Sequence, residues 1–261
     1  MIMRPYPEWL HLLAWFSLLI CIASAVWIMV DEFRSPQKMW IMNVVWPITG
    51  LYMGPLAIWL YWRTRPAMSA AANHGNRGHD AGKAGKKAVQ QESADEKDPS
   101  RLQTTVATFH CGAGCTLGDL LGETLVPAAA LFFAGEFGSK LLIDFFLAYL
   151  FGIVFQYFTV APMRNLGFWD GLKAALRADT ISIALFQVGM FGWMILVRYV
   201  LFPAPHLQSA DPVFWFMMQI AMVIGFFMSY PANRWLIRKG WKEKMPHEEA
   251  AMASETGLEA A

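Results

Sequence analysis

The chain has 261 residues, of which 56% are hydrophobic and only 16% are charged, and its mean hydropathy is +0.35. A water-soluble domain of this length needs more polar surface to cover its core. The net charge of +1 argues against a nucleic-acid-binding protein, and three cysteines inside apolar segments argue against a secreted, disulfide-stapled one. The composition therefore predicts an integral membrane protein that is surrounded by the lipid bilayer.

Apolar stretches near or above the length needed to cross a bilayer recur along the chain. They predict an all-α fold, a polytopic helical bundle with six transmembrane helices at residues 9–30, 39–62, 108–133, 140–162, 181–201 and 213–230. We expect the first two spans to form a hairpin (1–65). A polar, disordered cytoplasmic linker (66–103), a four-span membrane domain (104–245) and a cytoplasmic tail (246–261) would follow.

The connection between the fourth and fifth spans has a pattern of its own. Residues 164–180 have the periodicity of a short amphipathic helix on the membrane surface. Asp179 comes directly before the fifth apolar stretch, and we expect it to cap that helix.

Lysine and arginine are distributed unevenly between the connecting segments. With six spans, seventeen of them lie on one side of the membrane, and four, Arg34, Lys38, Lys140 and Arg198, lie on the other. The positive-inside rule then places both termini in the cytoplasm. The expected location is the bacterial inner (cytoplasmic) membrane.

The most distinctive motif is HCGAGC at residues 110–115, where the third span begins. Thiolates together with an imidazole suit Cu(I) or Zn(II), so His110, Cys111 and Cys115 are candidate metal ligands. Apolar packing of the thiols is an alternative, and a disulfide is another, although residues four apart on a helix fit its geometry poorly.

Acidic residues follow this motif along the same helical stripe. Asp119 and Glu123 would lie near mid-membrane, where carboxylates usually face the bundle interior and mark ion paths or proton relays. Glu136 and Asp144, near the non-cytoplasmic side, extend the predicted ion or proton path. The structural alternative is that protonated acids hydrogen-bond a neighbouring helix.

Small and soft side chains complete the candidate set. Gly114, Gly118 and Gly122 recur every four residues, a spacing typical of close helix packing in lipid. Four methionines on the last two spans are candidate soft ligands or pore-lining residues, although methionine also fills gaps in ordinary helix cores: Met190, Met194, Met218 and Met222.

Five segments of the chain carry a family resemblance: FHCGAGCTLGDLLGE, AYLFGIVFQYFTVAPM, ADTISIALFQVGMFGWM, FWFMMQIAM and GFFMSYPANRWLI. They resemble the bacterial and archaeal membrane family of domain of unknown function 4396. The resemblance covers about residues 105–245. It implies no established activity. It does imply an association with copper-handling and other metal-handling partner proteins, which favours a soft metal.

Three functional hypotheses follow. The first is transport or permeation of a soft metal cation, for which Cu(I) is the preferred candidate, or of protons. The second is a membrane redox protein that uses its thiols, or a haem held by His11 and His110, although this haem pair is a weak candidate. The third is a membrane scaffold without transport activity. No nucleotide-binding, kinase or hydrolase motif and no catalytic set is evident, and a homo-oligomer would allow a pore between copies.

Overall fold

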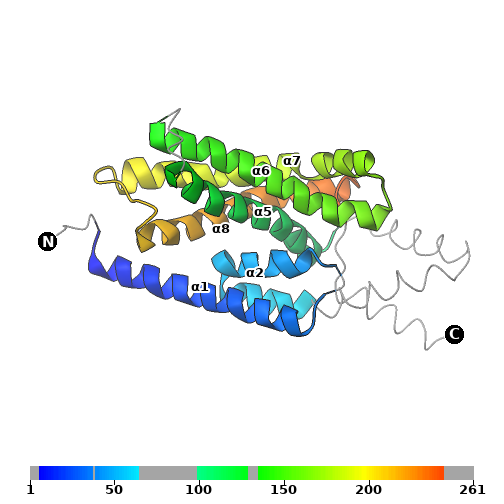
Figure 1. Ribbon diagram of the computed structural model, residues 1–261, viewed down its shortest axis with the longest axis horizontal. Coiled ribbons are helices and arrows are strands. Elements are labelled where there is room, and N and C mark those ends of the chain that lie inside the picture. Colours follow the sequence, from blue (N-terminus) through cyan, green and yellow to red (C-terminus); the bar gives the residue numbers. More distant parts are fainter. Residues whose placement is uncertain (1–5, 38, 65–98, 129–134, 244–261) are drawn as a thin grey trace, which may run out of the picture.

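Figure 1 shows the computed structural model, which describes residues 6–37, 39–64, 99–128 and 135–243, except for the side chains of residues 135 and 136. Every regular element in these residues is helical, which confirms the all-α prediction. The elements are α1 (Glu8–Arg34), α2 (Met42–Met53), a helix at residues 55–64, α5 (Arg101–Ala128), α6 (Gly135–Arg164), α7 (Phe168–Leu196), the π-helix η1 (Val197–Leu201) and α8 (Pro212–Arg238). The tail predicted at 246–261 and most of the predicted linker lie outside the described residues.

Four helices of the described chain are both long and apolar enough to cross a bilayer: α1, α6 from Phe137 on, α7 together with η1, and α8. The protein is therefore a membrane protein. The remaining long helix, α5, is more polar and lies inside the bundle, where residues 106–116 are all buried. Its 28 residues make a rod of about 42 Å, which is also long enough to span.

The second predicted span is wrong, because the chain reverses in its middle. Gly54 has φ 55° and ψ −132°, a conformation that only glycine adopts readily, and Pro55 follows it. The aromatic rings of Trp46 and Tyr61, which flank the turn, lie 5.7 Å apart between centroids. A straight helix would separate these residues by about 22 Å. Residues 42–64 therefore form a helical hairpin.

The hairpin enters the bundle and leaves it at the same end. Tyr61 donates a 2.7 Å hydrogen bond to Asp31, near the end of α1, whereas the tip at Gly54 lies beside Cys21, halfway along α1. The tip therefore reaches only the middle of the bundle (Figure 1). Hydropathy alone could not reveal this, because it measures composition and not chain direction.

The two ends of the described chain lie at different ends of the bundle. Tyr6, just before α1, hydrogen-bonds Asp211 at the start of α8 with an oxygen–oxygen distance of 2.5 Å. Lys242 lies just beyond the opposite end of α8, so the start and the end of the described chain lie at opposite ends of the bundle (Figure 1). The predicted cytoplasmic location of both termini concerns residues 1–5 and 244–261, which lie outside the described residues. We refer to the two ends of the bundle as the Glu8 end and the Arg238 end.

The connection before the fifth predicted span is also not a separate surface helix. Residues 168–196 form the single helix α7, in which Asp179 is fully buried, more than two turns after the helix begins. The predicted cap at Asp179 is therefore wrong. No proline or glycine interrupts the chain between Lys173 and Gln187, so the two apolar patterns join into one helix.

Candidate functional site

The glycine stripe of α5 forms the contact with α6. A Cβ on Gly114 would lie 2.6 Å from the Cα of Gly152, and one on Gly118 would lie 2.3 Å from the backbone nitrogen of Ala148. Backbone therefore meets backbone along this interface, as small residues permit in membranes. A Cβ on Gly122 would lie only 1.7 Å from Oδ1 of Asp144, so this glycine leaves the space that the Asp144 carboxyl group occupies.

A buried stripe of polar side chains runs along the middle of α5, from His110 to Glu123. The exposed fractions are 0% for His110, Cys111, Cys115 and Asp119, and 6% for Glu123. His110 lies towards the Arg238 end, beside Lys242, and Glu123 lies at the Glu8 end, beside Ser209 of the loop before α8. Burial of this many polar groups in one helix is costly in a membrane, and such groups usually serve function.

The thiols and the imidazole at residues 110–115 do not converge on one point. Cys111 and Cys115 are free thiols that interact with each other and with Tyr52 at the hairpin tip. The His110 Nδ1 atom faces the Val106 carbonyl oxygen at 3.4 Å, and its Nε2 atom has no hydrogen-bond partner. Within the described residues, no three His, Cys, Asp or Glu side chains are grouped so that they could hold a metal ion.

Asp119 is the deepest acid of the stripe and lacks a partner. Both of its carboxyl oxygens are buried without a hydrogen bond. The Gln187 side chain of α7 approaches it, yet no donor–acceptor pair of the two residues has hydrogen-bond geometry. Glu123 and Asp144 interact with it electrostatically. Buried polar atoms are nearly always paired, so the isolation of this carboxyl group calls for an explanation.

Glu123 and Asp144, at the Glu8 end, differ in their pairing. Glu123 forms a buried ion pair with Lys140 at 2.8 Å and accepts a hydrogen bond from Ser209. Lys140 also donates to Ser209 at 3.0 Å, so the three groups form a closed triangle. Asp144 keeps one oxygen, Oδ1, buried and unpaired. The side chain of Glu136, predicted to extend this path, lies outside the described residues.

A cavity of about 200 Å³ opens beside these acids, between α5, α6, α7, η1 and α8. Glu123, Lys140 and Asp144 line it, together with Arg198 and His206. Three of the four predicted methionines line the same cavity: Met190, Met194 and Met218. The fourth, Met222, is turned toward α5, where its sulfur accepts a 3.0 Å hydrogen bond from Thr116.

A second cavity, of about 410 Å³, lies over the hairpin tip. Its walls come from α1, the tip, α5 and α8, and include Trp15, Tyr52, Thr116 and Met222. It exists because the hairpin stops halfway and leaves the rest of the space between α1 and α8 unfilled.

The two histidines considered for haem lie far apart. His11 accepts a 3.2 Å hydrogen bond from Trp15 and stacks near Tyr6, at the Glu8 end. His110 lies beside Lys242, towards the Arg238 end. The two imidazoles therefore cannot ligate one haem.

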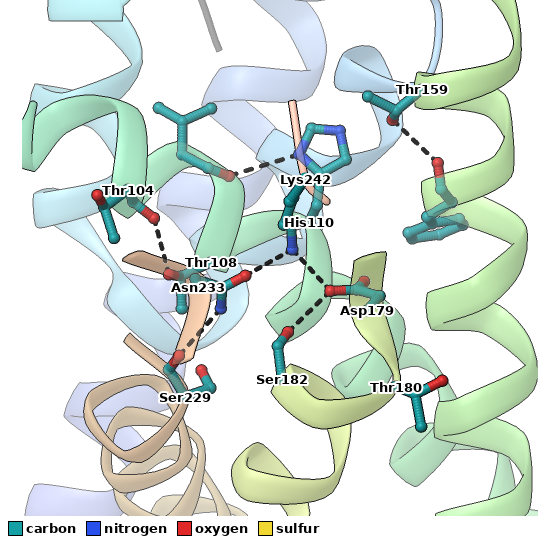
Figure 2. Close-up of polar contacts among 12 residues, drawn as sticks. Thr104, Thr108, His110, Thr159, Asp179, Thr180, Ser182, Ser229, Asn233 and Lys242 are labelled. Carbon is teal, nitrogen blue, oxygen red and sulfur yellow. Dashed lines mark hydrogen bonds and ion pairs between the residues drawn. The ribbon is translucent and has the colours of Figure 1, made fainter. Parts of the chain in front are cut away.

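A buried polar cluster towards the Arg238 end is one that the sequence did not reveal (Figure 2). Lys242 and Asp179 form an ion pair at 2.6 Å in which both side chains are 0% exposed. Lys242 also donates to Asn233 Oδ1 at 2.6 Å, and Ser182 donates to Asp179 at 2.7 Å. Two signals were available: the uninterrupted helical pattern through Asp179, and Gly240 just after α8, which is typical of a helix end that turns back.

Comparison with known proteins agrees with the boundary of the four-helix part. No curated protein and no solved structure matches the chain. The sequence profile of one family matches residues 102–242, more than half of the chain, from the first turn of α5 to the buried lysine beyond α8. The α1 helix and the hairpin lie outside the match. The chain belongs to the family described as Domain of unknown function (DUF4396).

Proposed function

We propose that the protein moves a small cation through the membrane along α5, and that this cation is the proton. The observation that carries this proposal is the Asp119 carboxyl group, which is fully buried and unpaired in a helix that runs the length of the bundle. A carboxyl group that is needed only for packing would be expected to hydrogen-bond a neighbouring helix. A carboxyl group that takes up and releases protons needs oxygen atoms that are not held by hydrogen bonds to neighbouring helices.

The neighbours of Asp119 supply the next positions of a relay. Asp144 and Glu123 lie on the side of the 200 Å³ cavity, and the Asp144 oxygen that Gly122 accommodates is unpaired. On the other side, Gln187 approaches Asp119, and the fully buried Gln156 side chain also lacks a partner. Protons would enter at the cavity, reach Asp119 through Asp144, and leave past His110 at the Arg238 end.

The proposed topology has five spans, α1, α5, α6, α7 and α8, with the hairpin entering from the cytoplasm. Under this topology eighteen of the 21 lysines and arginines belong to the cytoplasmic end, and the three others are Arg4, Lys140 and Arg198. This bias is stronger than with six spans, because Arg34 and Lys38 move to the cytoplasmic side. The Arg238 end is then cytoplasmic, and the start of α1 faces outward from the cytoplasmic membrane.

The test is proton flux into vesicles that contain the purified protein and a pH-sensitive dye, driven by a potassium diffusion potential. Wild-type vesicles should acidify faster than empty ones, and Asp119→Asn should reduce the rate to that of empty vesicles. Asp170→Asn is the matched control, because Asp170 is an exposed acid in the first turn of α7. Equal rates for the wild type and Asp119→Asn would refute the proposal.

A soft metal is the second candidate cargo, favoured by the three methionines that share the cavity with Glu123 and Asp144. Thioethers bind Cu(I), and carboxylates could complete such a site. Purified protein should then retain Cu(I) stoichiometrically, and Met190→Leu with Met194→Leu should lose it. If these substitutions leave Cu(I) retention unchanged, the cavity is not the copper site.

A further inference from the structure

The chain beyond α8 bends back into the bundle. Gly240 has φ +69°, its N–H bonds the Ile237 carbonyl at 3.0 Å, and the N–H of Trp241 bonds the Leu236 carbonyl at 3.0 Å. This pair of bonds is the usual way in which a helix ends on a left-handed glycine. Because of this turn, Lys242 points inward and not into solvent.

The returning segment is held from outside as well. The Arg177 guanidinium lies 4.0 Å from the ring centroid of Trp241. Arg164 pairs with Glu243 and donates a 3.2 Å hydrogen bond to the Gly240 carbonyl. The position of Lys242 is therefore set by its neighbours on both sides.

The Lys242 ammonium lies in a shell of oxygen atoms from two helices. Asp179 of α7 and Asn233 of α8 each accept from it at 2.6 Å, and Ser182 donates to the same Asp179 oxygen (Figure 2). Asn233 is itself oriented by a 3.1 Å hydrogen bond to the Ser229 carbonyl. A carboxylate and an amide oxygen converging on one point are ligands for a desolvated cation.

An unpaired oxygen atom also lies at this site. The second carboxylate oxygen of Asp179, Oδ2, is buried and has no hydrogen-bond partner. The fully buried His110 side chain lies nearby (Figure 2). The site therefore has acceptor capacity that the lysine does not use, at the point where the polar stripe of α5 approaches the Arg238 end.

We infer that Asp179, Ser182 and Asn233 form a cation site, for a primary ammonium or a monovalent metal cation, and that the ammonium of Lys242 is its built-in occupant. While Lys242 occupies the site, it closes the polar stripe at the Arg238 end. Displacement of the lysine opens the stripe. The closing role rests on the proposed cation movement along α5, whereas the binding role does not.

Binding is tested with the purified protein and methylammonium chloride. Lys242→Ala should lower the melting temperature by about 5–10 °C, because removal of one partner leaves a buried charge uncompensated. Methylammonium should restore most of this loss, and tetramethylammonium, which has no N–H donor, should not. The matched control is Lys239→Ala, because Lys239 is an exposed lysine on the same segment. Its melting temperature should stay near that of the wild type and should not respond to the amine.

A double variant keeps the binding test decisive. Lys242→Ala with Asp179→Asn has no uncompensated charge, so it should be more stable than Lys242→Ala and should not respond to methylammonium. Should Lys242→Ala fold only when methylammonium is present during purification, that result supports the site equally. A Lys242→Ala protein that no amine stabilises, while the double variant folds, overturns the proposal.

The closing role is tested in the proton-flux vesicles. Lys242→Ala should conduct faster than the wild type, and methylammonium on the side of the Arg238 end should slow it again. If methylammonium restores the stability of Lys242→Ala, but this variant conducts protons at the wild-type rate, the closing role alone is overturned. If neither the wild type nor Lys242→Ala conducts, the proposed function fails, and the stability measurements still decide whether the cation site exists.

Discussion

Gly118 gives the sharpest test of how α5 is held. A Cβ at this position would lie 2.3 Å from the backbone nitrogen of Ala148, 2.5 Å from its Cα and 2.8 Å from the carbonyl carbon of Leu147. Carbon atoms in contact prefer about 3.5–4.0 Å, so the two helices must separate by about 1–1.5 Å in Gly118→Ala. Because every clashing atom belongs to backbone, no side-chain rotation can relieve the overlap.

The expected magnitude follows from two opposing effects. Overpacking in a tight interior costs about 1–3 kcal/mol, and a backbone clash belongs at the upper end of this range. Alanine regains about 0.5–1 kcal/mol of helix stability over glycine, which leaves a net loss of about 2 kcal/mol. In a protein of this size, that loss lowers the melting temperature by about 4–8 °C.

The assay is thermal unfolding of the purified protein in detergent, followed by circular dichroism, with Gly192→Ala as the control. Gly192 lies in α7, and a Cβ there would have no neighbouring atom within 4 Å, so alanine should leave stability unchanged or raise it by about 0.5–1 kcal/mol. The reasoning is refuted if Gly118→Ala is as stable as the wild type. It is also refuted if both substitutions destabilise the protein equally, since the effect would then not come from the α5–α6 contact.

Three further predictions concern the charges, the turn and the topology. Lys140→Met should destabilise the protein by about 3 kcal/mol in a detergent unfolding titration, because Glu123 is left as a buried charge without its lysine. Adding Glu123→Gln removes that charge and should recover most of the loss; a double variant as unstable as the single one would contradict this. Gly54→Ala should cost about 1–3 kcal/mol in the same titration, because φ 55° with ψ −132° is strained for alanine; wild-type stability would exclude the hairpin turn. Reporter fusions to the two termini should give opposite sides of the membrane, and fusions that report the same side would restore the even number of spans.

The helical class and the special character of α5 could be predicted because they depend on local sequence. Hydropathy identifies an apolar helix wherever it lies, and a four-residue repeat of glycine places small residues on one face without reference to the rest of the fold. The same spacing argument places Asp119 and Glu123 on one stripe of α5, and both are buried in the structure.

The hairpin and the Asp179–Lys242 pair could not be predicted in the same way, because both depend on the direction of the chain. The Gly54–Pro55 step signals a break, yet it does not say whether the helix bends or reverses. Lys242 follows the last predicted span in the sequence, and only the three-dimensional turn at Gly240 brings it to Asp179. Charge counting does not detect the reversal either, since both topologies give a strong bias of the same sign.

The arrangement of charges along α5 connects these observations. At each end of the stripe a lysine neutralises a buried acid: Lys140 pairs with Glu123 at the Glu8 end, and Lys242 pairs with Asp179 towards the Arg238 end. Between them Asp119 has no partner. A cation that moved along α5 would therefore pass the ammonium group of one lysine, then the free carboxyl group of Asp119, and then the ammonium group of the other lysine. Loss of either lysine should then raise conduction, whereas loss of Asp119 should abolish it. A scaffold that only packs these helices would show loss of stability in all three cases and no change of flux in any of them.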